Sequence, residues 1–260
     1  MPIVDRDPPA YVRTALESLR GQTYGPIDIH LMLSGPLPAE LESVIAEVAP
    51  DPRVHLHRVA ERRPVGVNLN ALLDHTLGRY DYYARMDSDD EALLDRIAKQ
   101  VAFMGANPHI DVLGGAVIDI DERGRELKRV RYPLTHDDIV RAFRKRTPMA
   151  HPTVLFRPSF FEKAGSYPAR PLEDGLYWMR AIVRGCRFAN LPDALVRLRR
   201  SDAMLLRRSG LRTNWEELKI RVTVNRTLGF GPAAYLYGLA TFAAQMSPLW
   251  LKKILYDRLR

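Results

Sequence analysis

The sequence predicts an α/β protein, in which a mixed and mainly parallel sheet is flanked by helices and followed by a helical C-terminal extension. In the first half of the 260-residue chain, short apolar runs alternate with amphipathic segments, which is typical of parallel strands joined by covering helices. From Leu211 onward the pattern is helical throughout. A hydrophobic content of 46% favours a globular fold with a buried core over a disordered chain.

Turn residues and the spacing of apolar residues predict the helices and strands of the first half. Asp7, followed by two prolines, is suited to cap a helix that Gly21 ends. Residues 91–107 carry apolar side chains at a helical period, including Leu94 and Ile97, which predicts a helix with one buried face. We expect helices at residues 8–21, 38–48, 65–78 and 91–107, and strands at residues 27–33, 53–59 and 80–86.

The second half is more mixed. A helix is expected behind Thr135, which with Asp138 forms a possible capping box. Pro192 divides its apolar segment into a pair of short strands. The remaining elements are a strand at residues 110–120, a helix at 136–146, a strand and short helix within 151–165, a helix at 175–185 and the strand pair at 188–199. Because no repeat or low-complexity linker intervenes, we expect one domain at residues 1–210 and an extension at 211–260.

The first strand is short. Met1 to Val4 has the character of the last part of a strand, with a turn directly behind it. Such a stub adds little pairing to a sheet, whose usual strand has about five or six residues. We therefore interpret the first strand as truncated and expect the native chain to begin upstream.

Composition narrows the class of protein. The single cysteine, Cys186, excludes an intramolecular disulfide framework and a cysteine-based zinc cluster, and it suits a reducing compartment such as the cytoplasm. The net charge of +8 is concentrated at residues 141–146, 197–208 and 251–260. Such clusters attract the phosphates of nucleic acids, lipid headgroups or nucleotides, although they also occur as solvated helix faces. Because no nucleic-acid-recognition motif is present, we expect no nucleic-acid partner.

Residues 227–251 contain no charged side chain and approach the length of a membrane span. Pro232, Gln245 and Pro248 interrupt this segment, so we favour contact with the membrane surface over a span, with burial in the protein as the other alternative. The tail "WLKKILYDRLR" combines tryptophan, tyrosine and lysine, which suit the interface between headgroups and acyl chains.

Three aspartates stand in the segment "RMDSDDE" at residues 85–91. Asp90 can cap a helix that begins near Glu91. Asp87 and Asp89 are alternate residues at the end of an expected strand, so they can bring two carboxylates to one Mg²⁺ or Mn²⁺ ion. In open α/β sheets, ligands bind beyond the carboxyl ends of the strands, which favours a metal site here.

A second acidic pair, Glu173 and Asp174, stands at the start of another expected helix. It can cap that helix. It can also supply a general base, because a carboxylate can take a proton from an attacking hydroxyl.

These residues resemble glycosyltransferase family 2, whose members are inverting enzymes with the GT-A fold. The likeness covers roughly residues 1–210 and is closest to bacterial transferases of amylovoran and O-antigen biosynthesis. The segments that carry it are "YYARMDSDDEALLDRIAKQVAFMGANPHIDVLGGAV", "MAHPTVLFRPSFFEKAGSYP" and "LEDGLYWMRAIVRGCRFANLPDALVRLR".

The resemblance implies roles for particular residues. Asp87 and Asp89 match the family's DxD motif, which holds Mn²⁺ or Mg²⁺ on the diphosphate of a nucleotide sugar. Asp174 matches the acidic residue taken as the catalytic base. His151 stands in a "HP" context that implies a place near the metal or the acceptor, although a buried structural histidine is the alternative. The positions implied to contact the donor are Pro2, Val4, Asp5, Ser34, Asn68, Asp87, Arg207 and Arg208.

Two of these donor positions carry alternatives. Asn68, like Asn70, stands where the family approaches the nucleotide, but an asparagine in the first turns of a helix can simply cap it. Ser34 replaces the aspartate that usually precedes the glycine of the second strand. Because a hydroxyl lacks the charge-assisted hydrogen bond of a carboxylate, donor affinity is expected to fall about tenfold or more.

We therefore expect an inverting glycosyltransferase that adds a single sugar from a nucleoside-diphosphate donor, by preference UDP-linked, to a lipid-linked saccharide acceptor. Its implied setting is bacterial surface polysaccharide biosynthesis, with peripheral contact on the cytoplasmic face of the membrane. The alternative is a non-catalytic, glycosyltransferase-like scaffold subunit of a polysaccharide assembly complex, which the short first strand and Ser34 would suit.

Overall fold

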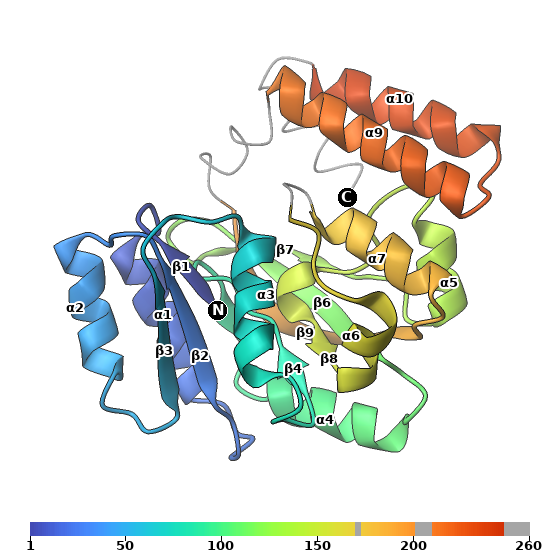
Figure 1. The fold of residues 1–260 in the computed structure, drawn as a ribbon. Helices are drawn as coiled ribbons and strands as arrows, with labels where there is room; N and C mark the ends of the chain where they lie inside the picture. The colour runs from blue at the N-terminus through green and yellow to red at the C-terminus, as the bar shows by residue number, and fades with distance from the viewer. Residues whose placement is uncertain (170–172, 201–209, 247–260) are drawn as a thin grey trace.

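A three-stranded parallel sheet and a larger mixed sheet form the centre of the protein in the computed structural model, with helices packed against both (Figure 1). The structure describes residues 1–169, 173–200 and 210–246. This arrangement confirms the predicted α/β class with a mixed sheet.

The first sheet runs in the order β1-β2-β3. Alternate residues of its strands point to opposite faces, so Leu31 and Leu33 pack under α1 and α2, whereas His30 and Ser34 lie on the face of α3. Its elements are β1 (Pro2–Val4), α1 (Pro9–Arg20), β2 (Ile29–Ser34), α2 (Ala39–Val48), β3 (Val54–Val59) and α3 (Val65–Thr76).

The second sheet runs in the order β4-β8-β6-β9-β5, and β7 pairs with β6. Its two long central strands, β6 and β9, are parallel to each other, whereas its other pairings are antiparallel. Its elements are β4 (Tyr83–Ala84), β5 (Glu91–Ala92), α4 (Arg96–Ala106), β6 (Val112–Ile120), β7 (Glu126–Val130), α5 (His136–Ala142), the 3-10 turn η1 (His151–Thr153), β8 (Leu155–Phe156), α6 (Pro158–Ala164), α7 (Glu173–Val183) and β9 (Phe188–Arg199).

Three expectations about local structure were wrong. The helix expected from Glu91 begins at Arg96, because Glu91 pairs with Arg197 in a short strand, and Leu94 is consequently 61% exposed. Pro192 lies within the single strand β9, where shifts in register with β6 accommodate it. Asp7 makes no capping hydrogen bond to α1.

The predicted cap of α5 is confirmed. The hydroxyl of Thr135 accepts a hydrogen bond of 3.3 Å from the backbone N–H of Asp138 and donates one of 2.7 Å to its carboxylate. This cap depends on neighbours three residues apart, which is why the sequence reveals it.

In the described residues after the second sheet, α9 (Leu211–Thr227) and α10 (Pro232–Gln245) lie side by side beyond α7 (orange and red in Figure 1). Ile220 and Val224 of α9 join the aromatic core beneath α7. On α10, Leu236 and Leu239 are 67% and 54% exposed. Within the described ranges, none of the helices has the length and apolar character needed to cross a membrane.

Gly66, in the first turn of α3, allows a close approach of the chain at Pro168. A Cβ atom at Gly66 would lie 2.5 Å from the carbonyl oxygen of Pro168, which is closer than atoms can pack. One turn later, the side chain of Asn70 exchanges two hydrogen bonds with the backbone of Tyr167, of 3.0 and 2.7 Å. The start of α3 therefore fixes the segment that leads towards α7.

We expect Gly66→Ala to lower the free energy of unfolding by about 1–3 kcal/mol, because the added methyl group must displace this backbone. Gly105→Ala is the matched control. Gly105 lies in α4, and a methyl group added there would meet nothing within 4 Å, so alanine is expected to raise stability by up to about 1 kcal/mol. Urea unfolding measures both values, and effects of the same sign and size would contradict the prediction.

Candidate active site

Three aspartates meet directly after β4. Side-chain oxygens of Asp87, Asp89 and Asp90 all lie within 4.8 Å of one another. Asp87 is 35% exposed at its side chain and forms an ion pair with Arg85, whereas Asp90 is buried. Carboxylate oxygens at this spacing, with one of them open to solvent, fit Mg²⁺ or Mn²⁺, which keep water or substrate oxygens as further ligands. The structure thus brings together the two aspartates predicted as metal ligands.

Burial and repulsion between neighbouring carboxylates raise the pKa of two of these aspartates. Burial raises the pKa of Asp89 to about 6, and the negative charges of Asp87 and Asp7 contribute to this rise. Burial is also the main reason why the pKa of Asp90 stands well above its ordinary value. A cation placed among these groups would relieve the repulsion, since opposite charge favours ionised carboxylates.

Asp90 is not the cap of a helix, as was expected, but a link to β9. Its carboxylate accepts a hydrogen bond of 2.9 Å from the backbone N–H of Arg199. The buried guanidinium of Arg199 in turn donates to the carbonyl oxygen of Asp89 at 3.1 Å and to the carboxylate of Glu91 at 2.6 Å. It also lies over the ring of Tyr11, 4.2 Å from its centroid. Arg199 therefore holds the aspartate segment against the end of β9.

Part of the basic cluster at residues 197–208 is committed to ion pairs inside the protein. Arg197 pairs with Glu126 at 3.0 Å, and Arg200, whose side chain is 9% exposed, pairs with Asp119 at 3.1 Å. These two arginines therefore pair with carboxylates of the sheet and do not form a solvated helix face. Arg207 and Arg208 lie outside the described residues.

Asp7 joins the turn after β1 to the aspartates. Its carboxylate accepts hydrogen bonds from the backbone N–H of Val4 at 3.0 Å and from the hydroxyl of Ser88 at 2.8 Å. Burial raises the pKa of Asp7. Next to it, the exposed Asp5 pairs with Arg62 at 3.2 Å. The ends of β1 and β4 are thus adjacent, as the predicted donor role of the first turn requires. Pro2, by contrast, is buried within β1.

Ser34 and Asn68 lie beneath this edge. The hydroxyl of Ser34 accepts a hydrogen bond of 2.9 Å from the backbone N–H of Arg63 and donates to the carbonyl oxygen of Glu61 at 3.3 Å. The side-chain amide of Asn68 donates to the carbonyl oxygen of Arg63 at 3.3 Å. Both side chains are wholly buried and support the segment between β3 and α3. A direct contact of either one with a donor would require this segment to open.

His151 lies in η1 and is not one of the three residues whose potential ligand atoms converge after β4. Its Nε2 atom is 3.3 Å from the hydroxyl of Tyr167, and its ring meets the ring of Trp178 edge-on at 5.4 Å. Burial is the main cause of a pKa well below the ordinary value. The structure therefore shows a buried histidine packed among aromatic rings, and its role as a metal ligand stays a prediction.

Asp174 stands in the first turn of α7, and its carboxylate accepts a hydrogen bond of 2.8 Å from the N–H of Gly175. The fully buried Tyr177 and Trp178 anchor the helix one turn later. Because Trp178 contacts His151, α7 begins on the same side of the core as η1. Residues 170–172, directly before this helix, lie outside the described residues.

Sequence reasoning missed Asp7, Arg85 and Arg199 as partners of the aspartates. Arg85 offered a signal, because it stands two positions before Asp87 on an extended segment and so points to the same side. The contacts of Asp7 and Arg199 connect residues that are far apart in the chain, and no local pattern indicates them.

Known proteins resemble the chain over most of its length. The model of the family described as glycosyl transferase family 2 matches residues 1–165. The amylovoran biosynthesis glycosyltransferase AmsE of Erwinia amylovora is 31% identical over 263 residues, which cover 98% of this chain and 96% of that protein. The UDP-Gal:alpha-D-GlcNAc-diphosphoundecaprenol beta-1,3-galactosyltransferase of Escherichia coli is 26% identical over 220 residues, with 84% and 79% covered.

Solved structures show the same fold at lower identity. Residues 1–349 of TarS from S. aureus, in complex with UDP-GlcNAc, superpose with a TM-score of 0.61 at 16% identity, covering 95% of this chain and 80% of that chain. The mannosyltransferase PcManGT from Pyrobaculum calidifontis, in complex with GDP-Man and Mn²⁺, gives a TM-score of 0.61 at 17% identity, with 98% and 77% covered. These likenesses confirm the predicted GT-A fold.

The match of the family model to more than half of the chain agrees with the relative that is 31% identical over nearly all of it. The predicted resemblance is therefore confirmed. This chain belongs to glycosyl transferase family 2.

Proposed function

We propose that this protein is a metal-dependent, inverting glycosyltransferase that moves a single sugar from a nucleoside-diphosphate donor to a saccharide acceptor in bacterial polysaccharide biosynthesis. The observation that carries the proposal is the group formed by Asp87, Asp89 and Asp90, whose carboxylates converge where β1, β4 and β9 end. The structural relative with GDP-Man and Mn²⁺ supports a divalent cation, and AmsE supports polysaccharide synthesis.

Asp87 and Asp89 would hold the cation, Mn²⁺ or Mg²⁺, against the diphosphate of the donor. When bound, such an ion would neutralise the negative charge that develops on the departing diphosphate. Asp87 is suited to this because its carboxylate is partly exposed. Arg199 and Asp7 would keep the segment in place through their contacts with Asp89 and Ser88.

Asp174 would act as the general base. Its carboxylate would take the proton of the acceptor hydroxyl while that oxygen bonds to the anomeric carbon, and the bond from this carbon to the diphosphate would break on the opposite face. The electron pair of the broken bond would leave with the diphosphate, so the configuration at the anomeric carbon inverts. Arg207 and Arg208 would help to neutralise the leaving group. The strand that precedes them ends beside Asp89, which supports this assignment.

A UDP-linked donor and a lipid-linked acceptor complete the proposal. The E. coli relative is named for UDP-Gal and a diphosphoundecaprenol-linked sugar, which supports both at 26% identity. The exposed Leu236 and Leu239 on α10 offer apolar side chains to the cytoplasmic face of a membrane. The domain at residues 1–210 would carry the chemistry, and residues 211–260 would bring it to the acceptor.

Calorimetry with UDP tests the donor site. We expect binding heat that depends on Mn²⁺ and falls sharply after chelation, because the carboxylates and the diphosphate share the ion. An excess of adenosine is the control, since it lacks the diphosphate. A non-catalytic scaffold that has lost its site would show no metal-dependent heat, and that result would reject the proposal of an active enzyme.

Vesicle binding tests the membrane contact. Leu236→Ser combined with Leu239→Ser is expected to reduce co-sedimentation with anionic vesicles by about tenfold or more, because each buried leucine contributes about 1.5–3 kcal/mol. Leu127→Ser on β7 is the control, because Leu127 is a comparably exposed leucine on another surface. Equal binding by all three proteins would exclude α10 as the contact surface.

A further inference from the structure

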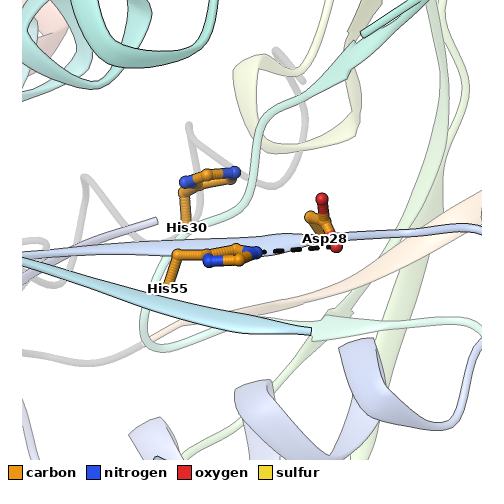
Figure 2. Close-up of side chains that lie close together, drawn as sticks. All are labelled: Asp28, His30 and His55. Atoms are coloured by element: carbon orange, nitrogen blue, oxygen red, sulfur yellow. Dashed lines mark ion pairs between the residues drawn. The ribbon is translucent and has the colours of Figure 1, made fainter. Parts of the chain in front are cut away.

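A second group of potential metal ligands lies on the first sheet, at the end opposite the aspartates. Side-chain atoms of Asp28, His30 and His55 all lie within 4.8 Å of one another. Figure 2 shows that the three side chains rise from the same face of the sheet. His30 stands near the start of β2, four residues before Ser34 at its carboxyl end, so about 13 Å of strand separates this group from the donor edge.

The parallel pairing of β2 and β3 creates the group. His30 and His55 are register partners, and their rings stack with centroids 4.6 Å apart. Asp28 comes two residues before His30 and therefore shares its face. One carboxylate oxygen of Asp28 lies 3.6 Å from Nε2 of His55 (dashed in Figure 2). The side chains of Asp28 and His55 are 37% and 38% exposed. The Nε2 atom of His55 is itself buried and has no hydrogen-bond partner among the described residues.

Neighbouring side chains form hydrogen bonds with His30 and Asp28 and so fix their orientation. The Nδ1 atom of His30 is 3.0 Å from Nε2 of His57, and its Nε2 atom is 2.8 Å from the hydroxyl of Tyr80. That hydroxyl donates to the second oxygen of Asp28 at 2.7 Å. Metal-binding histidines commonly use the other ring nitrogen in such a bond, which fixes the ring.

We propose that Asp28, His30 and His55 bind a divalent cation of the zinc class, in a site separate from the one that serves sugar transfer. Two imidazoles and one carboxylate form a donor set that suits Zn²⁺, with water in the fourth position. Ligands about 2.0–2.2 Å from a tetrahedral ion are about 3.3 Å apart, so modest rotations of these side chains would close the site. Mg²⁺, which selects oxygen ligands, would prefer the aspartates.

A bound ion would connect the start of β2 to β3. His57 would stay hydrogen-bonded to Nδ1 of His30. The other ring nitrogen of His30, Nε2, would then face the ion. Tyr80 would move aside, since its hydroxyl occupies the space between His30 and Asp28. The ion should therefore raise the melting temperature of the protein without a nucleotide.

Isothermal titration of the full-length protein with Zn²⁺ tests the proposal, after chelator treatment and in an excess of Mg²⁺ that occupies the aspartates. We expect one Zn²⁺ per chain with a Kd in the micromolar range or below. Asp89→Asn should bind Zn²⁺ as the wild type does, so the result does not depend on the proposed function. His30→Gln, His55→Gln and Asp28→Asn should each weaken binding at least tenfold.

His109→Gln is the matched control, because His109 is an exposed histidine outside the group and should retain wild-type binding. Thermal unfolding gives a second readout: Zn²⁺ should raise Tm in the wild type and in His109→Gln, but not in His55→Gln. Asp28→Asn keeps the shape of an exposed side chain, so it reports on binding even if a histidine variant folds poorly. A wild type that does not bind Zn²⁺ in excess Mg²⁺ overturns the proposal, as does unchanged binding in all three ligand variants.

Discussion

Asp89→Asn is expected to lower the rate of sugar transfer by about a hundredfold to a thousandfold, because it removes one of the two charges that would hold the cation on the diphosphate. The amide keeps the size of the carboxylate, so the hydrogen bond from Arg199 to the carbonyl oxygen of residue 89 should remain. The loss would therefore be one of charge and not of shape. Transfer of sugar from the nucleotide donor to a membrane lipid extract, with Mn²⁺ present, measures it.

The same substitution is expected to leave the metal-free protein equally stable or more stable. Burial and the charges of Asp87 and Asp7 raise the pKa of Asp89 to about 6. A carboxyl whose pKa is higher in the folded than in the unfolded state destabilises the fold above that pKa, where it is ionised in both states. Asparagine removes this cost at pH 7.5. Mn²⁺ should raise Tm in the wild type and much less in Asp89→Asn.

Asp137→Asn is the control for both measurements, because Asp137 is an exposed aspartate on α5. It should transfer sugar at the wild-type rate and respond to Mn²⁺ as the wild type does. Full activity in Asp89→Asn would show that the metal site lies elsewhere or is not needed.

Local sequence patterns predicted the elements that depend on near neighbours. The cap at Thr135 acts over three residues, and the pair formed by Asp87 and Asp89 depends on alternation along one segment, so both could be recognised from sequence. The strand that replaces the expected start of a helix at Glu91 could not be recognised from sequence. That residue pairs with Arg197, and such a long-range partner overrides the local preference for a helix.

The partners of the aspartates illustrate the same limit. Asp7 reaches Ser88, and Arg199 reaches Asp89, across separations that no periodicity encodes.

The group formed by Asp28, His30 and His55 depends on the register between two strands. His30 and His55 stand in two apolar runs that were correctly predicted as strands, but their meeting depends on which residues of β2 and β3 are partners. A slip by one residue would turn one of them to the other face.

Buried polar groups hold the backbone at the edge of the first sheet. Ser34 was expected to face the donor as a weaker substitute for a carboxylate, but it holds the backbone at Arg63 and Glu61. The expected loss of donor affinity assumed that its hydroxyl is free to meet the nucleotide. Because the structure commits that hydroxyl to the segment before α3, Ser34 would act on the donor through the position of this segment.

Asp174→Asn is expected to reduce kcat by about a hundredfold to ten-thousandfold, because an amide cannot accept the proton of the acceptor hydroxyl. The fold should tolerate the change. Tyr177 and Trp178 anchor α7 in the core, and the loss of one negative charge in the first turn of a helix costs only about 0.3–1 kcal/mol. Glu162→Gln, at an exposed position on α6, is the control and should keep the wild-type kcat.

The comparison with Asp89→Asn separates the two proposed roles. Asp174→Asn should retain the Mn²⁺-dependent heat of UDP binding, because a general base acts on the acceptor and not on the diphosphate, whereas Asp89→Asn should lose it. A lost heat of binding in Asp174→Asn would instead place this carboxylate in the donor site. A wild-type kcat would leave Asp174 as a residue that only stabilises the start of α7, and the proton of the acceptor would then have to go to another group.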